Sequence, residues 1–98
     1  ESEKSKEDYT LKVNETINNI REKLNTQLNF FNETENSIST IILSLQSLNT
    51  SNNAQRDSII SGLQGIRASL SSIGDGLTDS ISKLNDASLS GNFSSKTN

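Results

Sequence analysis

Apolar residues in this chain return on one helical face at heptad spacing. In a heptad frame with Leu28 at position a, residues 28–87 have 13 apolar residues at the 18 a and d sites and 8 at the other 42 sites. Apolar a and d sites on an otherwise polar helix are typical of a coiled-coil seam. The chain also contains no proline, so a long uninterrupted helix is permitted. We therefore expect an all-α protein whose narrow apolar stripe is covered by other helices.

An eleven-residue step comes before the heptads. Four apolar residues at spacings of three, four and four keep one face of the helix apolar before the heptad register begins. We expect the whole stripe to form an oligomer interface. Its residues are Ile17, Ile20, Leu24, Leu28, Phe31, Ile38, Ile42, Leu45, Ile59, Leu63, Ile66, Leu70, Ile73, Leu77 and Leu84.

The residue types on the stripe indicate how many helices meet. Between Leu63 and Leu84, Leu occupies every a site, and Ile66 and Ile73 occupy two of the three d sites. In parallel coils this combination favours trimers or tetramers over dimers. Ile41 and Leu48 widen the stripe at g sites, which also favours more than two helices. The main prediction is a long, nearly continuous helix in a parallel coiled-coil homotrimer or homotetramer.

Three polar residues, Asn49, Asn52 and Arg56, interrupt the stripe at successive a and d sites. If the helix continues through them, they form polar core layers that set helix register. If the chain turns near 49–53, they belong to an antiparallel helical hairpin, because Asn, Ser and Thr end helices and cap new ones. The heptad phase is unbroken from Leu45 to Ile59, which favours the continuous helix. Both interpretations stay open.

The chain divides by composition into three segments. Residues 1–8 are a mixed-charge lead-in, residues 9–88 are the coiled-coil helix with a polar interruption at 49–56, and residues 89–98 are a flexible tail rich in Ser and Asn. Residues 37–55 contain no charge, but their apolar part at 38–48 is too short to span a bilayer. We expect any membrane anchor to lie outside this chain.

The chain offers little chemistry for catalysis. It has no Cys and no His, which removes thiolate nucleophiles, imidazole bases and the strongest zinc ligands. A net charge of −3 and the lack of a Lys/Arg cluster argue against nucleic-acid binding. We expect no enzymatic activity, no catalytic residue, no metal site and no cofactor.

Four Asn-x-Ser/Thr sequons are possible N-glycosylation sites. They begin at Asn14, Asn32, Asn49 and Asn92. A chain with this much Asn, Ser and Thr contains about that many sequons by chance, so the motif alone does not establish glycosylation.

The eleven-residue step from residues 13–17 through Leu28, the passage into heptads, and the outer face rich in Ser, Thr and Asn resemble coiled-coil stalks of surface proteins. Within that group, residues 13–87 look most like membrane-anchored stalk subunits of archaeal surface layers, including tetrabrachion-like stalks. The resemblance implies a parallel trimer or tetramer, outside the cell or at its surface, that holds a lattice away from the membrane. It also implies contacts with other surface proteins and glycans at some of the sequons.

The expected function is therefore a structural, oligomerising stalk or spacer of an extracellular surface assembly. One alternative is a secreted helical hairpin that binds other proteins through residues 38–48. The other is an adaptor helix that pairs with different chains.

Overall fold

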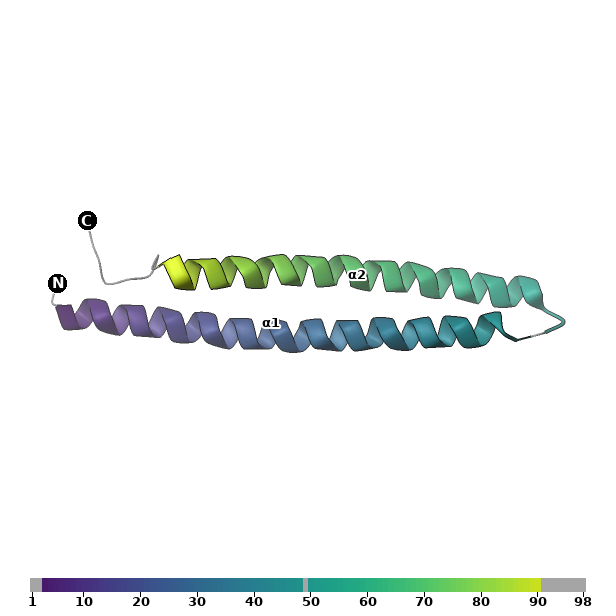
Figure 1. Ribbon diagram of the computed structural model, residues 1–98, viewed down its shortest axis with the longest axis horizontal. Coiled ribbons are helices and arrows are strands. Elements are labelled where there is room, and N and C mark those ends of the chain that lie inside the picture. Colours follow the sequence, from purple (N-terminus) through teal and green to yellow (C-terminus); the bar gives the residue numbers. More distant parts are fainter. Residues whose placement is uncertain (1–2, 49, 91–98) are drawn as a thin grey trace. The chain divides into compact units, whose positions relative to one another are not determined.

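The computed structural model describes residues 3–48 and 50–90, and it describes side chains as far as residue 87. The chain forms two long helices, α1 (Glu3–Gln46) and α2 (Asn53–Ser90), shown in Figure 1. All regular structure in the described residues is helical. The all-α expectation is confirmed. The lead-in from residue 3 onward and residues 89–90 of the expected tail belong to these helices, whereas residues 91–98 of that tail lie outside the described part.

The chain is organised as two compact units. Unit 1 consists of residues 1–27 and 77–98, and unit 2 consists of residues 28–76. Each unit therefore contains a stretch of α1 and a stretch of α2.

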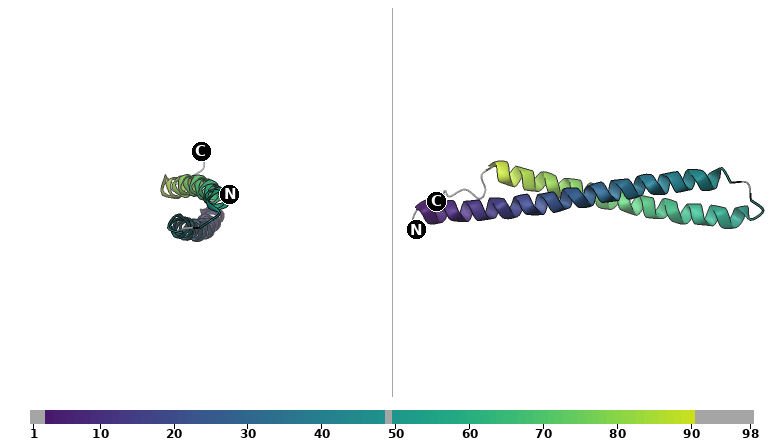
Figure 2. Two further views of the ribbon diagram at one scale, coloured as in Figure 1. Left: turned by 90° about the vertical axis from the view of Figure 1, so that its right-hand side faces the viewer. Right: turned by 90° about the horizontal axis from the view of Figure 1, so that it is seen from below.

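In unit 2 the two helical stretches run antiparallel, side by side (Figures 1 and 2). Arg67 Nη1 of α2 donates a hydrogen bond to Ser39 Oγ of α1 at 3.1 Å. Nearer the connection, Arg56 Nη1 donates to the carbonyl oxygen of Leu48 at 2.6 Å. As the residue number of the first partner rises from 39 to 48, that of its partner on α2 falls from 67 to 56. This order defines an antiparallel helical hairpin.

The expected continuous helix is interrupted between residues 46 and 53. The alternative expectation, a hairpin that turns near 49–53, matches the course of the chain in unit 2. In this structure, local hydrogen bonds of the polar residues in this segment accompany the end of one helix and the start of the next.

Asn52 starts α2. Its Oδ1 accepts a hydrogen bond from the backbone N–H of Gln55 at 3.2 Å, and its Nδ2 donates to Gln55 Oε1 at 2.9 Å. The backbone N–H of Asn52 donates to Thr50 Oγ1 at 3.2 Å. The first N–H groups of a helix lack helical partners, so an Asn at this position satisfies one of them. Asn52 is an exposed helix cap in this chain, not a buried polar layer.

Arg56 ties the end of α1 to the start of α2. Its guanidinium donates to the Leu48 carbonyl just beyond the α1 terminus, where the helix dipole attracts positive charge. The same group pairs with Asp57 at 3.1 Å. Arg56 was expected in a polar core layer, and it contributes instead to the turn. Asn49, the third residue of that expected layer, lies outside the described residues.

The core of unit 2 is small. Ile38, Ile42 and Ile60 are buried, with Ile42 only 4% exposed, and partly buried leucines pack against them. These leucines are Leu45, Leu63 and Leu70. Two helices enclose only a strip of side chains between them, so the core has the width of a coiled-coil seam.

In unit 1 the seam includes an arginine. Ile17 is buried, whereas Ile20 is 44% exposed, and the partly buried Arg21 occupies the side of α1 that faces α2. Arg21 Nη1 donates to Asn85 Oδ1 of α2 at 2.7 Å. The seam therefore keeps a three–four alternation through residues 17, 21, 24 and 28. Ile20, which the eleven-residue step placed on the stripe, lies outside the seam within this chain.

Among the described residues, neither helix contains a stretch apolar enough, over a sufficient length, to cross a membrane.

Candidate functional site

The face of α2 that contacts α1 is not the predicted stripe but a neighbouring face, rotated from it about the helix axis. Leu63 and Leu70, at predicted a sites, are partly buried, but Ile59 and Ile66, at predicted d sites, are exposed. Ile60, which was not predicted, is buried in their place. The inner face of α2 thus follows residues 60, 63, 67, 70, 74, 77, 81 and 84, and the predicted d residues lie outside the hairpin.

The fifteen predicted interface residues fall into three groups within the chain. Three are buried: Ile17, Ile38 and Ile42. Eight are partly buried: Leu24, Leu28, Phe31, Leu45, Leu63, Leu70, Leu77 and Leu84. Four are exposed: Ile20, Ile59, Ile66 and Ile73.

Sequence reasoning missed Ile60 and Ile81, which lie on the inner face of α2. The signal was present, because both residues continue a three–four spacing with Leu63, Leu77 and Leu84. Two features hid it. The half-buried Arg67 and the buried Gly74 occupy the same row, so the row does not look apolar in the sequence.

Within each unit, polar side chains from both helices meet beside the seam. In unit 1, Arg21 joins Asn18 of α1, through Nη2 at 2.8 Å, to Asn85 of α2, through Nη1 at 2.7 Å. In unit 2, Arg67 reaches Ser39 of α1. In each unit, the α1 residue of the contact directly follows a d residue: Asn18 follows Ile17, and Ser39 follows Ile38. The side of the seam next to d is therefore polar.

In unit 2 we name this side the polar flank. It consists of the residues that come directly after positions 31, 38 and 45 of α1 and positions 56, 63 and 70 of α2. These residues are Asn32, Ser39, Gln46, Asp57, Gln64 and Ser71.

The opposite side of unit 2 is apolar. On α2 the inner face places Ile60, Arg67 and Gly74 at a in place of the predicted a sites. In an antiparallel pair, the residues one position before a on the two helices lie on the same side of the seam, away from those that follow d. Five such residues are Ile or Leu, and each is between 47% and 55% exposed. We name this side the apolar flank; it consists of Ile41, Leu48, Ile59, Ile66 and Ile73.

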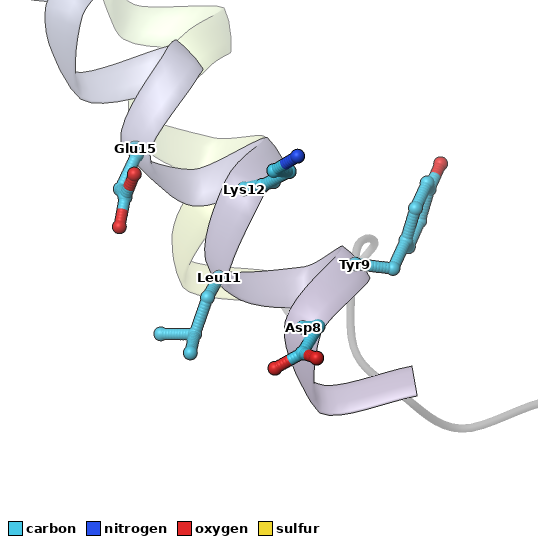
Figure 3. Close-up of a pocket in the computed structure, with 5 residues that line it drawn as sticks. All are labelled: Asp8, Tyr9, Leu11, Lys12 and Glu15. Atoms are coloured by element: carbon cyan, nitrogen blue, oxygen red, sulfur yellow. The ribbon is translucent and has the colours of Figure 1, made fainter. Parts of the chain in front are cut away.

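The structure describes a surface hollow with charged side chains near the amino end of α1. It is lined by Asp8, Tyr9, Leu11, Lys12 and Glu15. Figure 3 shows that these side chains diverge: Tyr9 points away from the carboxylates of Asp8 and Glu15. Groups that act together on a substrate must converge within hydrogen-bonding distance, so this hollow offers no catalytic arrangement.

No group of three or more acidic residues in the described part of the chain is arranged to hold a metal ion. The two ion pairs of that part, Arg56 with Asp57 and Lys83 with Asp79, are between neighbours on α2 and have exposed carboxylates. Exposed pairs of this kind contribute little to stability.

The sequons differ in accessibility. Asn32 is exposed, on the polar flank of unit 2, whereas Asn14 is partly buried on the inner side of α1. Asn49 and Asn92 lie outside the described residues. Asn32 is thus the more accessible of the two described sequon residues.

Comparison with known proteins finds no similar family model, curated protein or solved structure.

Proposed function

We propose that this chain is a non-enzymatic structural module that works by associating with copies of itself through helix–helix contacts. It serves as a stalk or spacer within a larger assembly. The observation that carries the proposal is the apolar flank, because five aliphatic side chains remain about half exposed after the hairpin has formed. A contiguous exposed apolar row rimmed by polar residues is typical of an interaction surface.

The size of the internal core also supports association. Among the described residues of unit 2, the only buried apolar side chains are those of Ile38, Ile42 and Ile60. A folded state stabilised by so few buried side chains gains much from covering more apolar surface, because each square ångström removed from water contributes about 25 cal/mol. Association and folding are therefore expected to strengthen each other.

Sedimentation equilibrium combined with circular dichroism tests this proposal. We expect a mass above the 10.7 kDa of one chain, and a thermal midpoint that rises with protein concentration because association stabilises the fold. A chain that stays monomeric at every concentration, with a constant thermal midpoint, would contradict self-association.

A parallel trimer or tetramer is a second arrangement of the same residues. It is favoured by the heptad phase that continues from Leu45 to Ile59, and by the Leu and Ile pattern around Ile66 and Ile73. In that arrangement the polar residues at 49–56 are helical, and the contacts between the two halves of the chain are replaced by contacts between chains. A solution mass of three or four chains, with the two halves far apart in each chain, would favour it.

We also propose a location outside the cell or at its surface, as the resemblance to surface stalks implies. Asn32 is the described residue best placed to carry a glycan there. Intact mass of the protein from its native source, before and after glycosidase treatment, tests this part. An unchanged mass equal to that of the polypeptide would remove the support from glycosylation.

A second candidate function is that of a protein-binding hairpin or adaptor for other chains. It is favoured by exposed aromatic and aliphatic side chains away from the seam, such as Phe30 and Leu43 of α1. A monomeric chain that gains helix and stability only when another protein is added would support this function.

A further inference from the structure

We propose that the apolar flank of unit 2 is the contact surface between two copies of this chain, which pair as hairpins into a four-helix bundle. This inference rests on the proposed self-association and adds which residues meet and how many chains take part. The polar flank faces water in the pair.

Charge on the flank favours a second copy over a partner of different chemistry. The five residues of the apolar flank are uncharged, and so is Thr34, the residue of α1 one heptad before Ile41. Two chains of net charge −3 can therefore meet there without placing carboxylates against each other. A surface without charge also offers nothing that selects a strongly acidic or basic partner.

The exposed area of the flank sets an upper limit on the contact. Its five side chains are each about half exposed, so complete cover in both copies removes at most about 1,000 Å² from water, near the lower limit for a specific interface. A contact of this size between identical surfaces is self-complementary when a two-fold axis relates the copies.

The spacing of the flank residues fits helix packing. Ile59, Ile66 and Ile73 are seven residues apart on α2, and Ile41 of α1 is followed seven residues later by Leu48, just beyond the end of α1. Residues with the period of Ile59, Ile66 and Ile73 form a continuous row on a helix, which can pack into the groove of a neighbouring helix as in four-helix bundles. Each hairpin then contributes the α2 row, with Ile41 and Leu48 on the same flank.

The main test compares two charge-matched double variants. Ile66→Glu/Ile73→Glu alters the apolar flank, and Gln64→Glu/Ser71→Glu alters the polar flank of the same helix at the same spacing. We expect the wild type and the polar-flank variant to sediment as dimers, at twice 10.7 kDa. We expect the apolar-flank variant to dissociate roughly 100-fold more readily, because its carboxylates would have to be buried without partners.

The outcomes separate this inference from the proposed function. A monomeric wild type defeats both. A wild type that associates, with the apolar-flank variant associating equally well, defeats the inference and leaves self-association standing. A mass of three or four chains for the wild type also contradicts the pairing of two hairpins.

A second measurement uses single substitutions at exposed sites, which leave the core of the hairpin unchanged. The chain has no cysteine, so Ile66→Cys and Gln64→Cys each introduce a single thiol. We expect the thiol at position 66 to react with a soluble alkylating reagent at least roughly 10-fold more slowly when the protein is concentrated than when it is dilute, because pairing covers it. The thiol at position 64 is expected to react at one rate throughout. Equal behaviour of the two thiols overturns the inference.

Discussion

Arg21 Nη1 of α1 donates a hydrogen bond to Asn85 Oδ1 of α2 at 2.7 Å, although the two residues are 64 positions apart in the chain. The second guanidinium nitrogen, Nη2, holds Asn18 at 2.8 Å. An arginine thus occupies a seam position where an apolar residue would bury more surface. A polar residue at such a position selects one register of the two helices over others, because a shifted register would leave its donors without these partners.

This contact predicts energetic coupling between Arg21 and Asn85. In a double-mutant cycle of Arg21→Ala and Asn85→Ala, we expect a coupling free energy of about 1 kcal/mol, as for a partly exposed hydrogen bond to a charged group. Urea denaturation of the four proteins measures it. Asn19→Ala, at an exposed site on α1, is the control and should change stability by less than about 0.5 kcal/mol. Strictly additive effects of Arg21→Ala and Asn85→Ala would show that the contact does not hold the helices together.

Neighbouring residues of α1 should respond very differently to truncation. Ile42 is 4% exposed and Leu43 is 66% exposed. We expect Ile42→Ala to lower the free energy of unfolding by about 2–4 kcal/mol, and Leu43→Ala by less than about 0.5 kcal/mol, because only the first empties a packed site. Denaturant titrations at one protein concentration provide the comparison. Similar losses for the two variants would mean that α1 presents a different face to α2.

The cap of α2 predicts a position-specific effect in the turn. Asn52→Ala removes the acceptor for the Gln55 N–H and should destabilise the hairpin by about 1 kcal/mol. Asn52→Asp keeps an acceptor and should retain most of the stability. Asn53→Ala, one residue further on, should be nearly neutral. Thermal unfolding followed by circular dichroism distinguishes these cases. If Asn52→Ala proves as stable as the wild type, residues 50–55 do not form this cap.

Glycines of α2 should be replaceable with a gain in stability. An added Cβ at Gly62, Gly65 or Gly76 meets no atom within 4 Å. Each change to Ala is expected to stabilise the helix by about 0.8–1 kcal/mol, the difference in helix propensity. At Gly74 the new Cβ would lie 3.6 Å from Leu28 Cδ1, an ordinary contact. Gly74→Ala therefore shows how the same change affects a site inside the seam, for comparison with the three open sites. Losses of stability at the three open sites would indicate that another chain approaches α2 there.

Much of the fold could be predicted from the spacing of apolar residues. The stripe on α1 from Leu28 to Leu45 forms its inner face, as expected. On α2 the adjacent pair Ile59 and Ile60 left the pattern ambiguous, because either residue can continue a heptad row through Leu63. Packing against α1 selects Ile60, and the predicted d row is left outside. Spacing within one helix does not determine which of two neighbouring apolar rows meets a given partner.

The turn was predictable only as an alternative. Asn, Ser and Thr between residues 49 and 53 are compatible with both polar core layers and helix caps. What decides between them is a set of contacts that depend on the fold, such as the bond from Arg56 to the Leu48 carbonyl. The apolar flank was visible in the sequence as part of the stripe. The sequence indicates that such a row is covered, without indicating whether the cover comes from the same chain or another.

Within residues 28–76, each chain folds back on itself. This fold is tested by the distance between spin labels attached through Asn29→Cys and Asp75→Cys, in a sample diluted with unlabelled protein so that only pairs within one chain are measured. Both sites are exposed, and they lie across the hairpin from each other. With helix axes about 8–10 Å apart, we expect a label separation of roughly 20–30 Å in the hairpin. A separation of about 70 Å, as for a continuous helix that rises 1.5 Å per residue, would contradict it.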